Sequence, residues 1–111
     1  MIEVKQLCGQ LCLGLQGENL ARVIYFDEAS EWRDKFGEGT CELLHLRNGD
    51  TEPYPVKLDK EDGRWCWKIT ASDTAKVGDG KCELYYIVND VVVKSKILTT
   101  NVLNSLGGEV L

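Results

Sequence analysis

The carboxylates of two acidic stretches are the first residues that could do chemistry. Asp50 and Glu52 form one pair, and Asp59, Glu61 and Asp62 form a denser group. Two carboxylates at a fixed separation in a cleft could hydrolyse a glycoside as acid and base. Both groups, however, lie among glycine and lysine in stretches typical of solvated loops, and the second lacks the longer, regular ligand spacing of a calcium loop. We therefore expect no catalytic or calcium-binding role for them.

Cysteine and histidine could supply a nucleophile or a zinc site. The single histidine is His45, and the five cysteines are Cys8, Cys12, Cys41, Cys66 and Cys82. Cys41 and His45 lie on one face of an expected strand but about 13 Å apart, too far for a nucleophile and its base. Cys8 and Cys12 have no CxxC partner downstream, so buried thiols packing as small apolar residues explain the pattern better than zinc. The odd count fits a reducing compartment, and we expect five reduced thiols and no metal or cofactor.

Aromatic residues could form a platform for stacking on sugars, which makes a small ligand- or glycan-binding β-sandwich module the alternative function. The candidates are Tyr54, Trp65, Trp67, Tyr85 and Tyr86. Alternation along the chain instead places most of them in the core, because Trp65 and Trp67 share a face with Ile69. Tyr86 likewise shares a face with Leu84 and Val88. Tyr85, beside Lys94, is the one aromatic residue expected to be exposed.

Composition excludes several classes of protein. A chain of 111 residues makes one domain, and 43% hydrophobic with 28% charged residues is ordinary for a globular protein. A net charge of −5 argues against a nucleic-acid partner. No apolar run approaches the roughly 20 residues that span a bilayer, so we expect no membrane partner. The N-terminus lacks a basic segment, which argues against a signal peptide.

The C-terminal third, residues 80–102, predicts a β-hairpin. Asn89 and Asp90 tolerate positive φ and predict a two-residue turn. The resulting register makes one nearly continuous apolar face from four pairs: Val88–Val91, Tyr86–Val93, Leu84–Ser95 and Cys82–Ile97. The opposite face pairs Tyr85 with Lys94 and Glu83 with Lys96. This hairpin favours antiparallel β-structure.

Further strands are expected at residues 2–6, 20–27, 40–47, 54–58 and 64–70. The strand at 20–27 is apolar on both faces and should be central, whereas Pro53 and Pro55 place 54–58 at an edge. A polar loop is expected at 59–63. Together with the hairpin, six or seven short strands at near-regular spacing predict a two-sheet sandwich. The residues expected to form its core are Trp65, Trp67, Ile69, Leu84, Tyr86 and Val93.

One helix is expected at residues 28–37, as a connection between strands. Ser30 would cap its N-terminus, Trp32 and Phe36 would pack together onto the sheet edge, and Gly37 would follow its last turn. Before the hairpin, Asp73 would cap a tight turn. Gly78 and Gly80 would supply the positive φ of that corner, as Asn89 and Asp90 do for the hairpin turn.

The predicted fold class is therefore all-β: an immunoglobulin-like antiparallel two-sheet β-sandwich with one short connecting helix. A single domain would cover residues 1–102. Residues 103–111 lose the alternation and resemble a linker. They would lead into a C-terminal region beyond this sequence.

Three motifs resemble those of a known family. They are Trp32 before a G-x-G-T strand (Gly37, Gly39, Thr40), an RNGD-x-x-PYPV segment (Arg47 to Val56), and Trp67 before an S-D-T-A-x-x-G-x-G-K-C-E-L-x-Y corner (Ser72 to Tyr86). Together they resemble the N-terminal immunoglobulin-like domain of phage and prophage tail or baseplate minor structural proteins of Firmicutes, related to the baseplate-upper-protein N-terminal domain. The resemblance covers about residues 18–102, and residues 1–17 lie outside it.

The resemblance implies a non-catalytic structural or assembly module of a phage or prophage tail or baseplate. Its partners would be other phage structural proteins, or further copies of itself, bound through protein–protein contacts. An edge strand or an exposed hairpin face would make those contacts. The protein would belong to the virion and assemble in the bacterial cytoplasm, which suits the free thiols.

Overall fold

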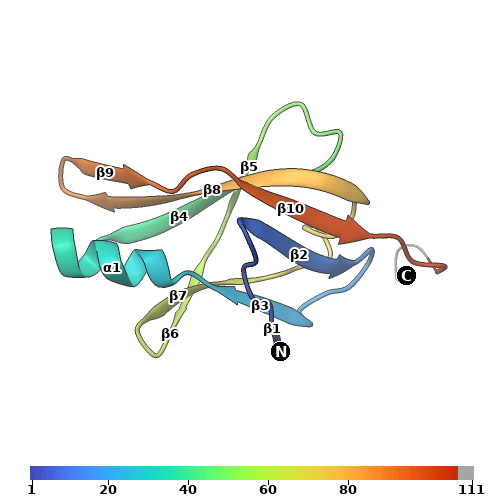
Figure 1. The fold of residues 1–111 in the computed structure, drawn as a ribbon, viewed down its shortest axis with the longest axis horizontal. Helices are drawn as coiled ribbons and strands as arrows, with labels where there is room; N and C mark the ends of the chain where they lie inside the picture. The colour runs from blue at the N-terminus through green and yellow to red at the C-terminus, as the bar shows by residue number, and fades with distance from the viewer. Residues whose placement is uncertain (108–111) are drawn as a thin grey trace.

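The computed structural model describes residues 1–107, which form two β-sheets and one helix (Figure 1). In chain order the elements are β1 (Ile2–Glu3), β2 (Gln10–Leu15), β3 (Arg22–Tyr25), α1 (Asp27–Phe36), β4 (Thr40–Leu46), β5 (Tyr54–Val56), β6 (Asp59–Glu61), β7 (Arg64–Lys68), β8 (Gly78–Val88), β9 (Val91–Lys94) and β10 (Leu98–Leu103). Within the described residues, no helix is long and apolar enough to cross a bilayer.

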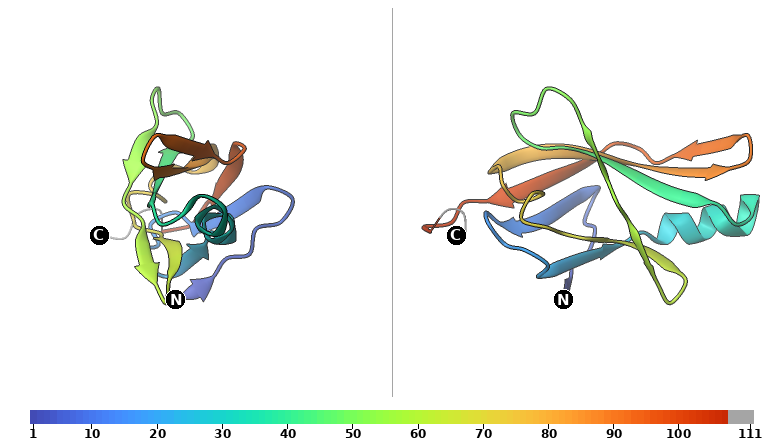
Figure 2. Two further views of the ribbon diagram at one scale, coloured as in Figure 1. Left: turned by 90° about the vertical axis from the view of Figure 1, so that its left-hand side faces the viewer. Right: turned by 180° about the vertical axis from the view of Figure 1, so that it is seen from behind.

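The two sheets form a sandwich, as predicted. One has the order β1-β3-β7-β6, and the other has the order β2-β10-β8-β4-β5 with β9 paired to β8. Figure 2 shows the chain crossing from one sheet to the other between β5 and β6. The expected wholly antiparallel pairing is wrong in two places, because β1 pairs with β3 and β2 pairs with β10 in parallel. Strands β1 and β2, which make these parallel pairs, lie in residues 1–17, outside the motifs that carry the family resemblance.

The core lies between the sheets. Trp67, Ile69, Leu84 and Tyr86 are buried there, while Trp65 and Val93 are half-buried at its margin. Alternation places these side chains, because every second residue of a strand points to the same face. Strands β2 and β3 add Leu11, Leu13 and Ile24 to the core, and Phe26, between β3 and α1, is buried there as well.

The hairpin register is confirmed near the turn. Tyr86 pairs with Val93, Tyr85 with Lys94, and Val88 with Val91. Asn89 has the expected positive φ, 52°, whereas Asp90 does not, so only the first turn residue adopts that conformation. Val91 nevertheless remains 40% exposed, because the hairpin tip extends beyond the core.

The register then shifts by one residue, so the predicted pairs Cys82–Ile97 and Glu83–Lys96 are wrong. Leu98 pairs with Cys82 instead. The cause is Ser95: its N–H donates to the Leu84 carbonyl at 2.8 Å, and its Oγ accepts the Leu84 N–H at 2.9 Å. The extra residue makes a bulge, which turns Ile97 outward at 62% exposure and Leu98 inward at 1%.

The helix differs from its prediction at two residues. It begins at Asp27, so Ser30 lies inside it and does not cap it; no side chain caps this end. Phe36 is exposed, because only Trp32 turns toward the core, where its ring centroid lies 6.1 Å from that of Tyr86. The end of the helix is as expected, since Gly37 has a φ of 102° and donates its N–H to the Arg33 carbonyl.

Two segments form strands that were not expected. Residues 10–15 form β2 because β10 offers its free edge, and Gly14, with a φ of 118°, lies where the register of that pair shifts. The expected loop at 59–63 contains β6, which ends in a turn at Asp62 and Gly63. The expected strand at 2–6 is reduced to β1, and the linker-like tail from residue 108 onward lies outside the described residues.

The glycines before the hairpin have different roles. Gly78 has the positive φ that was predicted, 116°. Gly80 has no positive φ, so that part of the prediction is wrong. It is needed for close approach instead: a Cβ at Gly80 would lie 2.3 Å from the Leu46 carbonyl oxygen.

Candidate functional site

The acidic stretches do not assemble into an acid–base pair. Asp50 is bound by Arg47, through Nε at 2.9 Å, and by Lys76. These two cations hold the pKa of Asp50 well below its usual range. Glu61 is bound separately, by Lys68 at 2.7 Å and by the Tyr25 hydroxyl at 3.2 Å. Each of these carboxylates serves a local ion pair.

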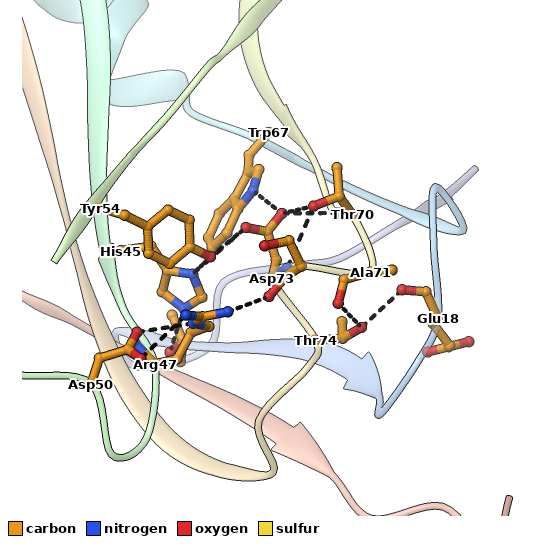
Figure 3. A network of polar contacts seen from close by, with 12 residues as sticks. Glu18, His45, Arg47, Asp50, Tyr54, Trp67, Thr70, Ala71, Asp73 and Thr74 are labelled. Atoms are coloured by element: carbon orange, nitrogen blue, oxygen red, sulfur yellow. Dashed lines mark hydrogen bonds and ion pairs between the residues drawn. The ribbon is translucent and has the colours of Figure 1, made fainter. Parts of the chain in front are cut away.

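The most extensive group of buried, hydrogen-bonded polar side chains in the described residues lies between the two sheets. We call it the Asp73 cluster, and Figure 3 shows it from close by. His45 comes from β4, Tyr54 from β5 and Trp67 from β7, and Thr100 comes from β10. Asp73 and Thr70 belong to the turn that follows β7. Both sheets and the connecting turn therefore meet at this point.

Asp73 is the acceptor at the centre of this cluster. Its Oδ2 accepts from Trp67 Nε1 at 3.1 Å, from the Thr70 N–H at 2.8 Å and from Thr70 Oγ1 at 3.0 Å. Its Oδ1 accepts from the Tyr54 hydroxyl at 2.6 Å. Burial alone would raise the pKa of Asp73, but these bonds and the nearby His45 outweigh it and lower the pKa to about 2. The carboxylate is therefore charged at neutral pH.

The hydrogen bonds assign the proton of His45. Because the Tyr54 hydroxyl donates to Asp73, its oxygen is an acceptor for His45 Nδ1, which lies 2.7 Å away. The other ring nitrogen, Nε2, accepts from Thr100 Oγ1 at 3.4 Å. A neutral imidazole with its proton on Nδ1 satisfies every group in this relay.

Hydrogen bonds link a histidine, a tyrosine and an aspartate, as in an acid–base relay. The histidine and the aspartate at its two ends are, however, shielded from solvent. His45 is 1% exposed and Asp73 is 3% exposed. Arg47 covers the Tyr54 ring, with its guanidinium carbon 4.9 Å from the ring centroid. No buried side-chain nitrogen or oxygen of residues 1–107 lacks a hydrogen-bond partner. The Asp73 cluster therefore joins the two sheets, with its histidine and aspartate withdrawn from solvent.

Sequence reasoning found only part of this cluster. Asp73 does cap its turn through Thr70, as predicted, but its bonds to Trp67 and Tyr54 were not foreseen. For His45, the sequence suggested only a nucleophile pair with Cys41 or a zinc site, and no buried hydrogen-bond role. A signal was present, because Cys41, Leu43 and His45 alternate on one face of β4 and all three are buried. A polar ring in such a position needs buried partners.

The thiols form no metal site. Among the described residues, no group of three or more histidine, cysteine, aspartate or glutamate side chains could hold a metal ion. Cys8 and Cys12 are exposed, the other three cysteines are buried, and all five are free. Burial raises the pKa of Cys41 and of Cys82 to about 12, so these two thiols are poor nucleophiles.

The aromatic residues do not form an exposed platform. Trp67 is fully buried, and Lys60 covers the half-buried Trp65 with its Nζ 5.4 Å from the ring centroid. Tyr85, expected to be exposed, is half-buried under Lys94. Trp65 and Tyr85 nevertheless both line a groove of about 590 Å³ beside β4 and β5.

Several strand edges are open at the surface. In the four-stranded sheet the outer strands are β1 and β6, and in the other sheet they are β2 and β5. Strand β9 pairs with β8 alone among the described strands. An open edge offers unpaired N–H and C=O groups to another chain.

Comparison of the chain with models of protein families finds no match, and comparison with curated proteins finds none. Function must therefore be inferred from the residues and their arrangement.

Proposed function

We propose that this chain is a non-catalytic association module of a bacteriophage or prophage tail or baseplate. The observation that carries the non-catalytic part is the closed Asp73 cluster. His45 and Asp73 are buried, Tyr54 is half-buried under Arg47, and no buried polar side-chain atom of residues 1–107 lacks a hydrogen-bond partner. A catalytic group needs contact with a substrate, directly or through one water. We therefore assign the cluster a stabilising role in the sandwich, and we expect binding to use residues at the surface.

The surface features that support association are open edges and exposed apolar side chains. Strand edges can extend a sheet into a neighbouring protein. Exposed apolar residues lie near several of them, including Leu15 on β2, Val92 on β9 and Leu103 on β10. The net charge of −5 favours a protein partner over nucleic acid.

The tail or baseplate setting rests on the sequence motifs. The segments that carry the resemblance form turns and core in this structure. Trp67 and Asp73 join in the buried cluster, and Gly39 packs against β8, where an added Cβ would lie 2.4 Å from the Ile87 carbonyl oxygen. A two-sheet sandwich is also the architecture that immunoglobulin-like modules share.

Labelling of phage particles tests this proposal. Antibodies raised against the purified chain would be applied to particles released after induction of the host prophage, with gold detection by electron microscopy. We expect label at the tail or baseplate, and the same chain in immunoblots of purified particles. Normally formed tails that carry neither label nor chain would overturn the tail assignment.

The groove beside β4 favours one second candidate, the binding of a small ligand or glycan. Trp65 and Tyr85 line it together, and aromatic rings are common in ligand pockets. A glycan array would detect such binding. In that case Tyr85→Ala should abolish it, while Tyr25→Ala, a matched change outside the groove, should leave it intact.

A further inference from the structure

Strand β9 presents one edge to solvent with a defined set of backbone groups. Val88 and Val91 flank the two-residue turn and form the first hydrogen-bonded pair with β8. Bonding then alternates, and the Ser95 N–H indeed points to the Leu84 carbonyl on β8. The N–H and C=O groups of Val92 and Lys94 therefore point away from the sheet.

This edge has fewer of the protective features found at the other described edges: it has one exposed charge, Lys94, and it is four residues long. Strand β5 contains Pro55, β6 is a charged strand of three residues, β2 has a register shift at Gly14, and β1 has two residues. Strand β9 reads VVVK and contains neither proline nor a bulge. Val92 is 56% exposed. An edge of three valines with outward-pointing backbone groups can act as a template for another strand.

The edge is also held in a fixed position. Figure 1 shows α1 lying at the same end of the molecule as β9. Tyr86 on β8 donates its hydroxyl hydrogen to the Gly37 carbonyl at 2.7 Å and accepts the Gly39 N–H at 2.8 Å. Its ring packs against Trp32 of the helix. A partner strand would therefore meet a pre-organised edge, which lowers the entropic cost of pairing.

The sequence of this edge is complementary to itself. In an antiparallel pair related by a two-fold axis, directly opposed residues lie on the same face of the sheet. An axis through Val92 places Val92 opposite its own copy, and Val91 opposite Val93. The same axis brings Asp90, in the turn directly before β9, next to Lys94 of the other copy, and symmetry repeats this opposite-charge pair. Val92 and Lys94, whose backbone groups point outward, would then bond across the axis.

We propose that the β9 edge is a homodimerisation site, at which a second copy of this chain adds its own β9 antiparallel in the register that pairs Asp90 with Lys94. A second copy fits better than an unrelated strand because the charge pattern is satisfied in both directions at once. The dimer would join two six-stranded sheets into one continuous sheet. This inference rests on the proposed function, because it names one partner of an association module.

Sedimentation velocity on the whole chain tests the proposal, over concentrations from about 10 μM to about 1 mM, because a contact of four-residue strands should be weak. We expect a reversible monomer–dimer equilibrium. Lys94→Asp should weaken dimerisation at least about tenfold, because the new aspartate would lie beside Asp90 of the other copy and repel it. Asp90→Lys should do the same, and the double change Asp90→Lys with Lys94→Asp should restore dimerisation.

Lys96→Asp is the matched control, since it makes the same charge change on the same stretch outside the proposed pairs. It should leave the dimer unchanged. If Lys96→Asp weakens the dimer and Lys94→Asp does not, the proposed register is wrong. Failure of the double change to restore a dimer that both single changes had weakened would equally overturn it, provided that all variants melt cooperatively.

Amide hydrogen exchange of the unmodified chain gives a second readout that needs no substitution. Exchange at Val92 and Lys94 should slow as concentration rises, while Val91 and Val93, already bonded to β8, should not change. A chain that stays monomeric up to about 1 mM, with no such slowing, overturns the homodimer. A monomeric chain found on phage tails would overturn this inference alone, whereas a dimer absent from particles would overturn only the tail assignment.

Discussion

Replacing Asp73 by asparagine tests whether the buried carboxylate stabilises the sandwich through its charge. Folding lowers its pKa from 3.8 to about 2. At 1.36 kcal/mol for each unit, the ionised form contributes about 2–3 kcal/mol to the free energy of unfolding at pH 7. Asparagine has the shape of the protonated acid, so Asp73→Asn should lose about this amount.

The loss should depend on pH in a defined way. Because folding lowers the pKa, the stabilisation is fully present above the unfolded value near 3.8 and disappears as the pH falls through about 2. The difference between the original chain and Asp73→Asn should be about 2–3 kcal/mol at pH 7, should fall to about half of that at pH 3, and should be well under 1 kcal/mol at pH 2.

The variant should also reverse the hydrogen-bond relay. The asparagine amide would donate to Tyr54, the Tyr54 hydroxyl would donate to His45 Nδ1, and His45 Nε2 would donate to Thr100. The imidazole proton would therefore move from Nδ1 to Nε2. Nitrogen-15 NMR distinguishes these two tautomers directly.

Urea unfolding followed by tryptophan fluorescence would measure the stability difference at each pH. Asp34→Asn is the matched control, because it removes the same charge from a helix position whose side chain is 76% exposed. It should change stability by less than about 0.5 kcal/mol. A stability difference for Asp73→Asn that stays constant between pH 7 and pH 3 would refute a role for the charge, and an unchanged tautomer would refute the relay.

Three further changes probe the core, the bulge and the thiols. Trp67→Ala should cost about 3–5 kcal/mol and yield an unfolded or insoluble protein, because the ring is fully buried against His45; a cooperative melt near the original midpoint would contradict this. Leu98→Ala should cost about 2–5 kcal/mol and its neighbour Ile97→Ala less than about 0.5 kcal/mol, and chemical denaturation showing the reverse order would exclude the bulge. Thiol titration should find two rapidly reacting groups in the native chain, Cys8 and Cys12, and five after denaturation without reductant; fewer than five would indicate disulfides.

Regular alternation made much of the β-structure predictable. The hairpin pairs near Asn89 are a local consequence of the turn and the side-chain period of two, and they are confirmed. The edge position of β5 followed from proline in the same way. Turn and strand signals of this kind act between neighbours in the chain, so they need no knowledge of the rest of the fold.

Local signals failed where a distant segment decided the outcome. Strand β2 has a glycine-interrupted sequence and forms because it pairs in parallel with β10, nearly 90 residues away. The start of α1 likewise depends on Phe26, which is buried in the core next to the helix. No pattern within these segments reports on such partners.

The candidate site was the least predictable part of the protein. Asp73 could be recognised as a turn cap because Thr70 lies three residues before it. Its bonds to Trp67 and Tyr54, and the second contact of Tyr54 with His45, span three strands and the turn. Only the packing of the two sheets brings those groups together.

The sequence by itself determined the class of this protein, because its strand period, turn residues and apolar content favour a two-sheet sandwich and offer no catalytic motif. Tertiary structure alone decided the bulge at Ser95, the pairing of the N-terminal strands and the closure of the Asp73 cluster. The physical reason is range. Periodicity and turn preference act over a few residues, whereas edge pairing and the burial of polar groups depend on which distant surfaces the folded chain brings into contact.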